Sequence, residues 1–241
     1  MDAPQMASDT RLTEVILRDA RELAEGTMAF RFAKPEGFAF KAGQAIDLEV
    51  NGERHAFSIV TAPFEDEIVI ATRMRDSAFK RALRGTAPGA ALGIDGPFGA
   101  LTLHKNPKRA AVFIAGGIGI TPFISMLRQA ARDGFAQPIA LVYSNRRPED
   151  SAFLDELQAL ARSHPRFRLV ATMTEMEKSS HPWEGERHLV DAELLKSAAR
   201  GLPDPIYYVA GPPAMVAAIR KALTAAGVED DDVRAEDFHG Y

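Results

Sequence analysis

A run of residues without any charge, 110–127, constrains the fold of this chain more than any other feature. It is long enough to cross a bilayer as a helix, which takes about 18 apolar residues. Residues that destabilise a continuous helix interrupt it, however: Gly116, Gly117, Gly119 and Pro122. We therefore predict a buried parallel strand over residues 110–115, a glycine turn over 116–119 and a helix that begins at Thr121.

The start of that helix suits the binding of an anion. Threonine is a good helix N-cap and proline fits the first helical turn, as in Thr121-Pro122. A glycine turn that leads into a helix brings backbone N–H groups and the positive end of the helix dipole close to a pyrophosphate. The match to G-x-G-x-x-G is incomplete, so a tight strand-to-helix turn without a ligand explains the segment equally well.

The composition of the 241-residue chain is that of an ordinary globular protein, with 46% hydrophobic and 26% charged residues. A net charge of −4 gives no reason to expect nucleic acid or an acidic membrane as a partner. The absence of cysteine excludes disulfides, thiolate nucleophiles and cysteine-ligated zinc or iron–sulfur centres. Because the first residues also lack the apolar core of a signal peptide, we expect a cytoplasmic protein without a membrane span.

The first half of the chain consists of short segments in which apolar and polar residues alternate. These segments cover residues 13–17, 28–32, 45–50, 55–60 and 68–71, and turn residues separate them. Short strands at this spacing are typical of an antiparallel barrel or sandwich. One helix interrupts the series over residues 77–83, with Asp76 or Ser77 as its cap.

After the polar stretch 104–109, apolar strands alternate with amphipathic helices. We predict strands at 110–115, 139–143, 167–172 and 206–210, and helices at 121–131, 150–162, 192–199 and 213–226. This alternation is typical of βαβ units wound around a parallel sheet. The predicted fold class is therefore two-domain, with an antiparallel β-barrel at 1–106 followed by a doubly wound α/β domain with a parallel sheet at 107–241.

Ligands of open α/β sheets bind beyond the carboxyl ends of the strands. Here those ends lead into residues 116–122, 143–147, 172–175 and 210–215. The last of these is again a strand that ends in glycine and a helix with proline in its first turn, Ala210-Gly211-Pro212-Pro213. Two such helix starts in one sheet favour a long anionic ligand that lies across it.

In the first half, four short motifs resemble those of the ferredoxin–NADP⁺ reductase superfamily. Phe40 with Gly43-Gln44 is similar to F-x-x-G-Q, and Gly96-Pro97-Phe98-Gly99 is similar to G-P-x-G. Ser77, at a helix start, resembles a phosphate-binding serine. His55-Ala56-Phe57-Ser58, with Pro63 behind it, resembles R-x-[YF]-[ST]. In this last motif His55 stands where the family has the arginine that contacts the FAD pyrophosphate, and Arg54 lies one residue early.

Three further motifs in the second half follow the family's order, so the resemblance extends over about residues 10–241. Residues 116–122 resemble G-G-x-G-[IV]-T-P, residues 210–213 resemble [CA]-G-P-P, and residues 236–241 resemble the acidic-x-aromatic terminus. The resemblance implies a barrel that binds FAD, and an α/β domain that binds NADP or NAD and whose C-terminal tail returns to the flavin. It implies an oxidoreductase in which NAD(P)H gives a hydride to the flavin and the electrons pass to a separate acceptor, such as ferredoxin or flavodoxin.

The same resemblance implies the site residues. Three of them are implied as catalytic: Ser58 near the flavin N5 edge, Thr121 beside the nicotinamide, and Glu236 for handling a proton. Phe238 or Tyr241 is expected to stack on a ring. The implied cofactor-binding residues are His55, Ala56, Phe57, Ser58, Arg75, Ser77, Gly116, Gly117, Gly119, Thr121, Pro122, Asn145, Arg146, Arg147, Gly211, Pro212, Phe238 and Tyr241.

Several alternatives stay open at the level of sequence. Arg146 and Arg147 follow the second strand of the sheet, where they either bind a 2′-phosphate or lie in a solvated loop. The basic residues Lys80, Arg81, Arg84, Lys105, Lys108 and Arg109 either dock an acidic electron carrier or are simply solvated. The histidines other than His55 show no metal-ligand spacing, and we expect His104 and the others at the surface.

The acceptor is also open. The alternatives are an NAD(P)H-dependent reductase of small acceptors such as free flavin, ferric chelates or quinones, and a flavin-binding electron-delivery subunit that acts only in a complex. The residues do not distinguish NADH from NADPH or FAD from FMN, and they do not determine the oligomeric state or the effect of His55.

Overall fold

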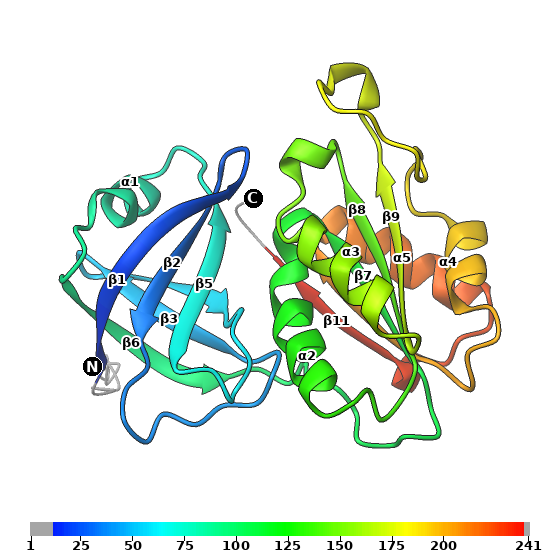
Figure 1. Cartoon of the computed structure of the whole chain (residues 1–241), viewed down its shortest axis with the longest axis horizontal. Helices are drawn as coiled ribbons and strands as arrows, with labels where there is room; N and C mark the ends of the chain where they lie inside the picture. Colours follow the sequence, from blue (N-terminus) through cyan, green and yellow to red (C-terminus); the bar gives the residue numbers. More distant parts are fainter. Residues whose placement is uncertain (1–11, 239–241) are drawn as a thin grey trace, which may run out of the picture.

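The computed structural model describes residues 12–238, which form two domains that lie side by side (Figure 1). In the first domain an antiparallel sheet has the strand order β4-β3-β6-β1-β2-β5. Its strands are β1 (Thr13–Ala24), β2 (Thr27–Ala33), β3 (Ala45–Val50), β4 (Glu53–Ser58), β5 (Glu67–Arg73) and β6 (Ala91–Phe98). The edge strands β4 and β5 contact each other, so the sheet curls into the predicted antiparallel barrel.

The alternation along these strands builds the core of the barrel. Inward-facing side chains from different strands, among them Phe30, Ile46 and Ile70, are fully buried together. The helix α1 (Ala78–Gly85) adds Phe79 and Leu83 to this core. Ser77 is its N-cap, as predicted, because the Ser77 hydroxyl accepts a hydrogen bond from the backbone N–H of Lys80.

Two features of the barrel differ from the sequence prediction. β1 continues to Ala24, through the polar residues that follow the predicted strand, because its first part pairs with β6 and the rest with β2. β6 was not expected at all, since Gly93, Gly96 and Pro97 break the alternation. It forms because β1 and β3 offer hydrogen-bonding partners on both of its sides.

The second domain is the predicted doubly wound sheet, with the parallel order β11-β10-β7-β8-β9. The strands are β7 (Ala111–Gly116), β8 (Ile139–Asn145), β9 (Phe167–Met173), β10 (Ile206–Gly211) and β11 (Val233–Asp237). Helices α2 (Thr121–Arg132) and α3 (Leu154–Ser163) cover one face of the sheet. Helices α4 (Ala192–Ala199) and α5 (Pro213–Ala225) cover the other face (Figure 1).

The charge-free stretch is the centre of this sheet and not a membrane helix. All residues of β7 are buried, and a 3₁₀ turn over Gly117–Ile120 links the strand to α2. Pro122 lies in the first turn of α2 as expected, but the N-cap is Ile120 rather than Thr121. The Thr121 hydroxyl donates instead to the carbonyl oxygen of Ile118. No helix in the described part of the chain is long and apolar enough to cross a membrane.

The helix predicted over residues 150–162 begins later than expected. A 3₁₀ turn over Pro148–Asp150 comes first, and α3 starts at Leu154 after Phe153 with a φ of 62°. The cause is Asp150, whose carboxylate is buried in ion pairs and so is not a helix cap. The segment Val233–Asp237, for which the sequence predicts no element, forms the edge strand β11 beside β10.

The two domains share a buried core and are joined by a linker in which Leu101 and His104 are buried while residues 105–108 are exposed. Barrel residues Val60 and Ala71 pack in the same cluster as Phe123 of α2. In the linker, His104 is buried and its Nδ1 lies 2.9 Å from the hydroxyl of Tyr208, which corrects the expected surface position. Burial lowers the pKa of His104, so this linker residue is neutral at pH 7.

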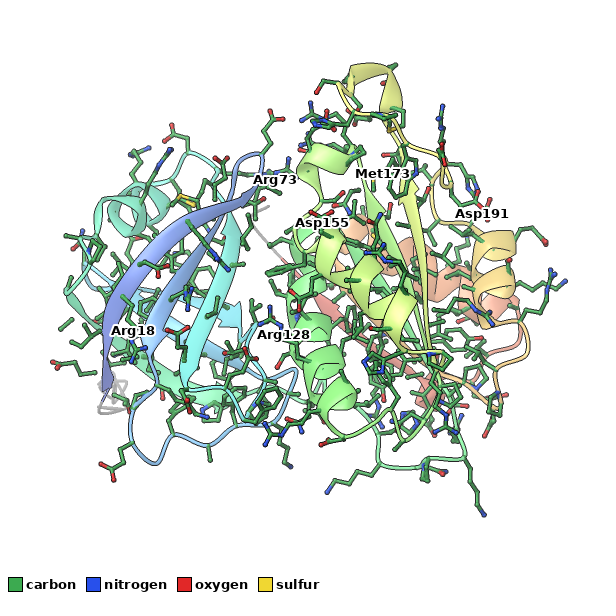
Figure 2. All side chains as sticks on the ribbon, viewed as in Figure 1. Arg18, Arg73, Arg128, Asp155, Met173 and Asp191 are labelled. Atoms are coloured by element: carbon green, nitrogen blue, oxygen red, sulfur yellow. The ribbon has the colours of Figure 1, made fainter. Side chains whose placement is uncertain are left out.

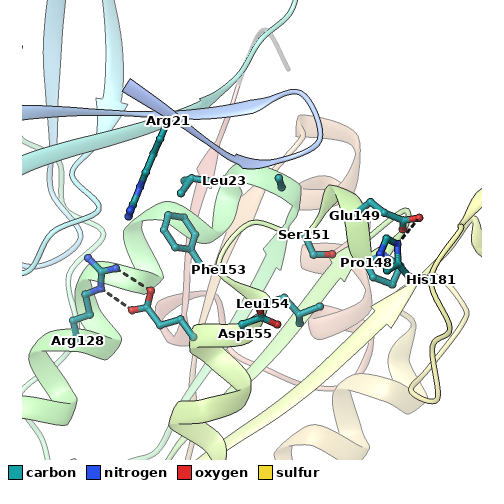
Figure 3. A pocket seen from close by; sticks show the side chains of 12 residues that line it. Arg21, Leu23, Arg128, Pro148, Glu149, Ser151, Phe153, Leu154, Asp155 and His181 are labelled. Carbon is teal, nitrogen blue, oxygen red and sulfur yellow. Dashed lines mark hydrogen bonds and ion pairs between the residues drawn. The ribbon is translucent and has the colours of Figure 1, made fainter. Parts of the chain in front are cut away.

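A cavity of about 520 Å³ lies beneath the β1–β2 hairpin, where the barrel meets α3 (Figure 3). Arg21 and Leu23 reach over it from β1, and Phe153 and Arg128 line it from the other domain. Nearby, the backbone N–H of Glu25 donates to the carbonyl oxygen of Glu149. The hairpin is thus a direct contact between the domains.

Candidate functional site

A second cavity, of about 450 Å³, lies at the carboxyl ends of the parallel strands and is closed on one side by the barrel. This is the position that open α/β sheets use for ligands. The 3₁₀ turn after β7, the end of β8, the start of α5 and two barrel arginines all contribute to its wall. Its residues are Arg73, Arg75, Gly116, Gly117, Ile118, Gly119, Ser144, Asn145, Arg146, Thr174, Leu189, Gly211, Pro212, Met215 and Phe238.

At this cavity the backbone of the glycine turn after β7 lies unusually close to the backbone of β10. A Cβ on Gly119 would lie 2.3 Å from the carbonyl oxygen of Ala210 and 2.8 Å from the Cα of Gly211. Only glycine fits between those backbone atoms. Gly117, by contrast, has a φ of 53° and open space where a Cβ would point. The turn therefore presents main chain, without side chains, to a ligand in the cavity.

Asn145 lies at the end of β8, on the cavity wall. It is 6% exposed, and its Nδ2 has no hydrogen-bond partner among the described residues. A buried donor without an acceptor is costly, so such groups in folded proteins are usually completed by water or a ligand. A ligand oxygen in the cavity would complete this donor.

The two arginines after β8 have different environments. Arg146 is 46% exposed and lines the cavity, although its Nη2 also donates to Asp150. Arg147 does not line the cavity, because it pairs with Asp150 and with Glu25 of the barrel. Of the two, only Arg146 lines the cavity.

Asp150 joins the two domains. Its carboxylate is 2% exposed and accepts hydrogen bonds from Arg146, Arg147 and, across the interface, Arg73 of β5 at 2.9 Å. Figure 2 shows Arg73 at the gap between the domains. One buried carboxylate thus holds three guanidinium groups, two of which line the cavity.

The C-terminal segment crosses from the sheet to the cavity. Phe238 is buried, lines the cavity, and its backbone N–H donates to the carbonyl oxygen of Gly211. Glu236 is half-buried on β11, opposite Ala210 of β10, and burial raises the pKa of its carboxyl group. Tyr241 lies outside the described residues.

A second group of residues lies on the barrel, where β4 meets α1. We call it the β4–α1 cluster and define it as His55, Phe57, Thr72, Phe79 and Lys80. Measured between ring centres, the Phe79 ring lies 4.3 Å from the His55 ring and 5.9 Å from the Phe57 ring. Lys80 lies over the face of Phe57. Ser77 caps the same helix, so two of the family-like motifs meet here.

The basic run does not form one exposed surface. Lys80 faces the β4–α1 cluster, and Arg81 pairs with Asp76 of its own helix start. Arg109 is 21% exposed and pairs with Asp204 and Asp232. Three of the six positions considered for docking an acidic carrier therefore have partners within the described residues, although Arg81 is still exposed.

The structure brings together many, but not all, of the residues that the resemblance implies. Arg75, the three glycines of the turn, Asn145, Arg146, Gly211, Pro212 and Phe238 line one cavity. His55 and Phe57 lie in the β4–α1 cluster, while Ala56 and Ser58 accompany them on β4. Thr121 and Pro122 are buried in α2 and do not line the cavity.

Six cavity residues are not among those that the resemblance implies. Four of them lie in the strand-end segments where the sequence predicts a ligand: Ile118, Ser144, Thr174 and Met215. Arg73 and Leu189 carry no local signal, because their position follows from how distant segments pack.

A curled antiparallel barrel, a doubly wound sheet and a shared cavity define the class of two-domain nucleotide-dependent oxidoreductases. The family model "Oxidoreductase NAD-binding domain" matches residues 113–221. Ferredoxin–NADP reductase B of Sorangium cellulosum is 33% identical over 226 residues, which cover 88% of this chain and 90% of that protein. The chain therefore belongs to the ferredoxin–NADP⁺ reductase family, and it is an NAD(P)H-dependent flavoprotein reductase.

More distant proteins extend the comparison. The reductase component of propane 2-monooxygenase from Rhodococcus jostii is 29% identical over 95% of this chain, but the chain spans only 63% of that protein. The crystal structure of a ferredoxin NADP⁺ reductase from Neisseria gonorrhoeae with bound FAD and NADP has a TM-score of 0.80 at 23% identity. That match covers 95% of this chain and 99% of the other, and it shows the shared fold.

The residues present fit FAD and a nicotinamide dinucleotide. The glycine turn leaves its backbone open to a ligand, and Asn145 offers an unused buried donor beside it. On the barrel, the β4–α1 cluster exposes His55 beside the capped start of α1, and a helix start of this kind suits the phosphates of a flavin nucleotide.

Proposed function

We propose that this reductase takes electrons from NADPH through FAD and delivers them to a small electron-carrier protein, a ferredoxin or a flavodoxin. The cavity carries the proposal, because residues of both domains line it and a nicotinamide there lies next to the barrel. The name of the Sorangium relative supports both the donor and the acceptor. The chain has no cysteine to hold an iron–sulfur cluster of its own, which favours a separate acceptor.

The flavin, when bound, supplies the chemistry of accepting a hydride and releasing electrons. We assign the protein's own groups to positioning. The backbone of the glycine turn and the Asn145 amide hold the dinucleotide, and Phe238 separates it from solvent. Glu236 holds a proton near this site, which its raised pKa supports. Ser58 is assigned to the ring edge of the flavin on the resemblance alone.

The proposed role of Thr121 beside the nicotinamide has the weakest structural support. Its side chain is 2% exposed and its hydroxyl already donates to Ile118. Its contribution is then to hold the shape of the glycine turn, on which the ligand rests. We also propose a cytoplasmic location, which the absence of cysteine supports.

Arg146 is proposed to select NADPH over NADH. With Arg146→Ala, we expect kcat/KM for NADPH to fall about 30-fold, since a charge-assisted contact to the 2′-phosphate is lost. The kcat/KM for NADH should change by less than about threefold, because NADH lacks that phosphate. Steady-state kinetics with both donors measure the effect, and Arg220→Ala, an exposed arginine on α5, is the control. Equal losses with NADPH and NADH would contradict the assignment.

Anaerobic reduction of the purified protein tests the whole proposal. We expect a yellow protein whose flavin absorbance is bleached by NADPH faster than by NADH, and which then reduces a ferredoxin or a flavodoxin. A colourless protein that takes up no added FAD would overturn the proposal. Reduction of ferric chelates, quinones or free flavin at the full rate of NADPH oxidation, without any carrier protein, would favour the small-acceptor alternative.

A specific observation supports one further candidate function. Relatives of this chain include the electron transfer component of toluate 1,2-dioxygenase from Pseudomonas putida, 27% identical over 93% of this chain. A role as the electron-delivery subunit of an oxygenase would explain that similarity. Absence of turnover with every free carrier, together with co-purification of a larger partner, would favour this role.

A further inference from the structure

The β4–α1 cluster contains a cation that no carboxylate neutralises. The Nζ of Lys80 contacts the Oγ1 of Thr72, which is fully buried, and lies 4.8 Å from the centre of the Phe57 ring. No Asp or Glu among residues 12–238 forms an ion pair with it. Its amine therefore has one hydroxyl and one aromatic face as partners, and no anion.

Such an environment is unfavourable for a positive charge. Partial burial removes water from the ammonium group without supplying a counter-charge. Burial accordingly lowers the pKa of Lys80 to about 8. An anion that binds beside the amine would offset this desolvation cost. Lys80 is therefore suited to bind an anion.

The other cations near the motif at residues 55–58 already have a carboxylate beside them. Arg54 donates from its Nε to Glu49 at 2.8 Å. His55 packs its ring on Phe79, and its Nε2 lies 3.9 Å from a carboxylate oxygen of Glu53. The positive charge that the family motif carries at position 55 is therefore missing from β4 itself.

We propose that Lys80 supplies the positive charge that binds the pyrophosphate of FAD, in place of the arginine that the family motif has at position 55. The geometry supports it, since Lys80 reaches from α1 to the aromatic residue of that motif. Ser77 caps α1 on the backbone N–H of Lys80 itself, so the cap and the lysine belong to the same first turn of the helix. The inference rests on the use of FAD stated above and adds the residue that holds its phosphates.

Titration of the full-length, flavin-free protein with FAD, FMN and riboflavin tests this, with quenching of flavin fluorescence as the readout. We expect Lys80→Met to weaken the binding of FAD and of FMN about 30-fold, because a charged hydrogen bond is lost. The affinity for riboflavin, which has no phosphate, should change less than about twofold. Lys80→Arg should restore FAD affinity to within about threefold, and Arg84→Met, an exposed cation on the same helix, is the control.

The wild-type protein provides a second measurement that needs no substitution. An anion binds the protonated amine, so FAD affinity should be constant below about pH 8 and fall by up to about tenfold per pH unit above it. The other charged groups on α1 and on the elements packed against it are Asp47 and Glu49 of β3, Glu53, Arg54 and His55 of β4, Glu67 and Arg73 of β5, Arg75 and Asp76 before α1, and Arg81 and Arg84 of α1. Lys80→Arg should abolish the pH dependence, because arginine stays charged.

The outcomes separate this inference from the proposed function. Wild-type protein that binds FAD, with Lys80→Met binding it equally well, overturns the role of Lys80 alone. Equal losses for FAD and riboflavin also overturn it, because they indicate packing against Phe57 rather than charge. Wild-type protein that binds no flavin at all overturns this inference and the proposed function together.

Discussion

The variant Gly119→Ala should keep its FAD but lose reduction by NADPH. The added Cβ would collide with the carbonyl oxygen of Ala210 and the Cα of Gly211, so the turn must move away from β10. We expect a loss of about 3 kcal/mol in the free energy of unfolding. The rate of flavin reduction should fall at least about 100-fold, because small displacements of a bound donor have large kinetic effects. Stopped-flow absorbance and thermal unfolding measure the two effects.

The matched control for stability is Gly117→Ala, two residues earlier in the same turn; it is no control for reduction, because position 117 lines the cavity. Its Cβ meets nothing within 4 Å, and the cost is the left-handed backbone alone, about 1 kcal/mol. Its flavin content should equal that of the wild type, as should that of Gly119→Ala, because the β4–α1 cluster lies on the other domain. If Gly119→Ala is reduced by NADPH within about threefold of the wild-type rate, the close approach of the turn to β10 has no functional role.

Elements with clear periodicity could be predicted from the sequence. The strand predicted over residues 45–50 and the helix predicted over 192–199 have those bounds in the structure, and the helix predicted over 213–226 ends one residue earlier. In each case the apolar spacing alone identifies the buried face. The glycine turns at both helix starts were also predicted, because strand, glycine and proline follow each other directly in the chain.

Other elements depend on partners that are distant in sequence. β6 contains two glycines and a proline and is a strand only because β1 and β3 pair with it. The start of α3 moves because Asp150 pairs with Arg73, which lies 77 positions earlier. Neither set of partners can be predicted from local pattern, since no periodicity links residues that are distant in sequence.

The candidate site divides in the same way. Backbone positions such as Gly119 could be predicted from the sequence, since few residue types permit the close approach of two backbone segments. The roles of side chains that act through charge could not be predicted, because they depend on the partners of those side chains. Arg147 looks equivalent to Arg146 in sequence, yet it is bound to Glu25 and Asp150. Lys80 looks like part of a solvated basic run until its contact with Phe57 is known.

The second large effect is expected for Asp150→Ala. This substitution removes the carboxylate that Arg73, Arg146 and Arg147 share, and leaves three cations close together at the domain interface. We expect the free energy of unfolding to fall by about 2–3 kcal/mol. This loss is below the usual range for a fully buried ion pair, because the arginines are partly exposed and regain water. The melting temperature should fall by roughly 5–10 °C. Differential scanning calorimetry measures the change.

Glu25→Gln is the control for this prediction. Glu25 belongs to the same network through Arg147, but its side chain is 64% exposed. Exposed ion pairs contribute little to stability, so the free energy of unfolding of this variant should differ from that of the wild type by less than about 0.5 kcal/mol. Comparable losses for Glu25→Gln and Asp150→Ala would mean that the network acts through surface charge rather than through the buried carboxylate.

Asp150→Asn separates charge from shape at this position. The amide has the same size and still accepts a hydrogen bond, but it neutralises none of the three guanidinium groups. If the charge of Asp150 holds the domains together, Asp150→Asn should be nearly as unstable as Asp150→Ala, and both should reduce flavin more slowly with NADPH because Arg73 no longer ties β5 to the cavity. If Asp150→Asn is as stable as the wild type, hydrogen-bond geometry rather than charge sets the interface.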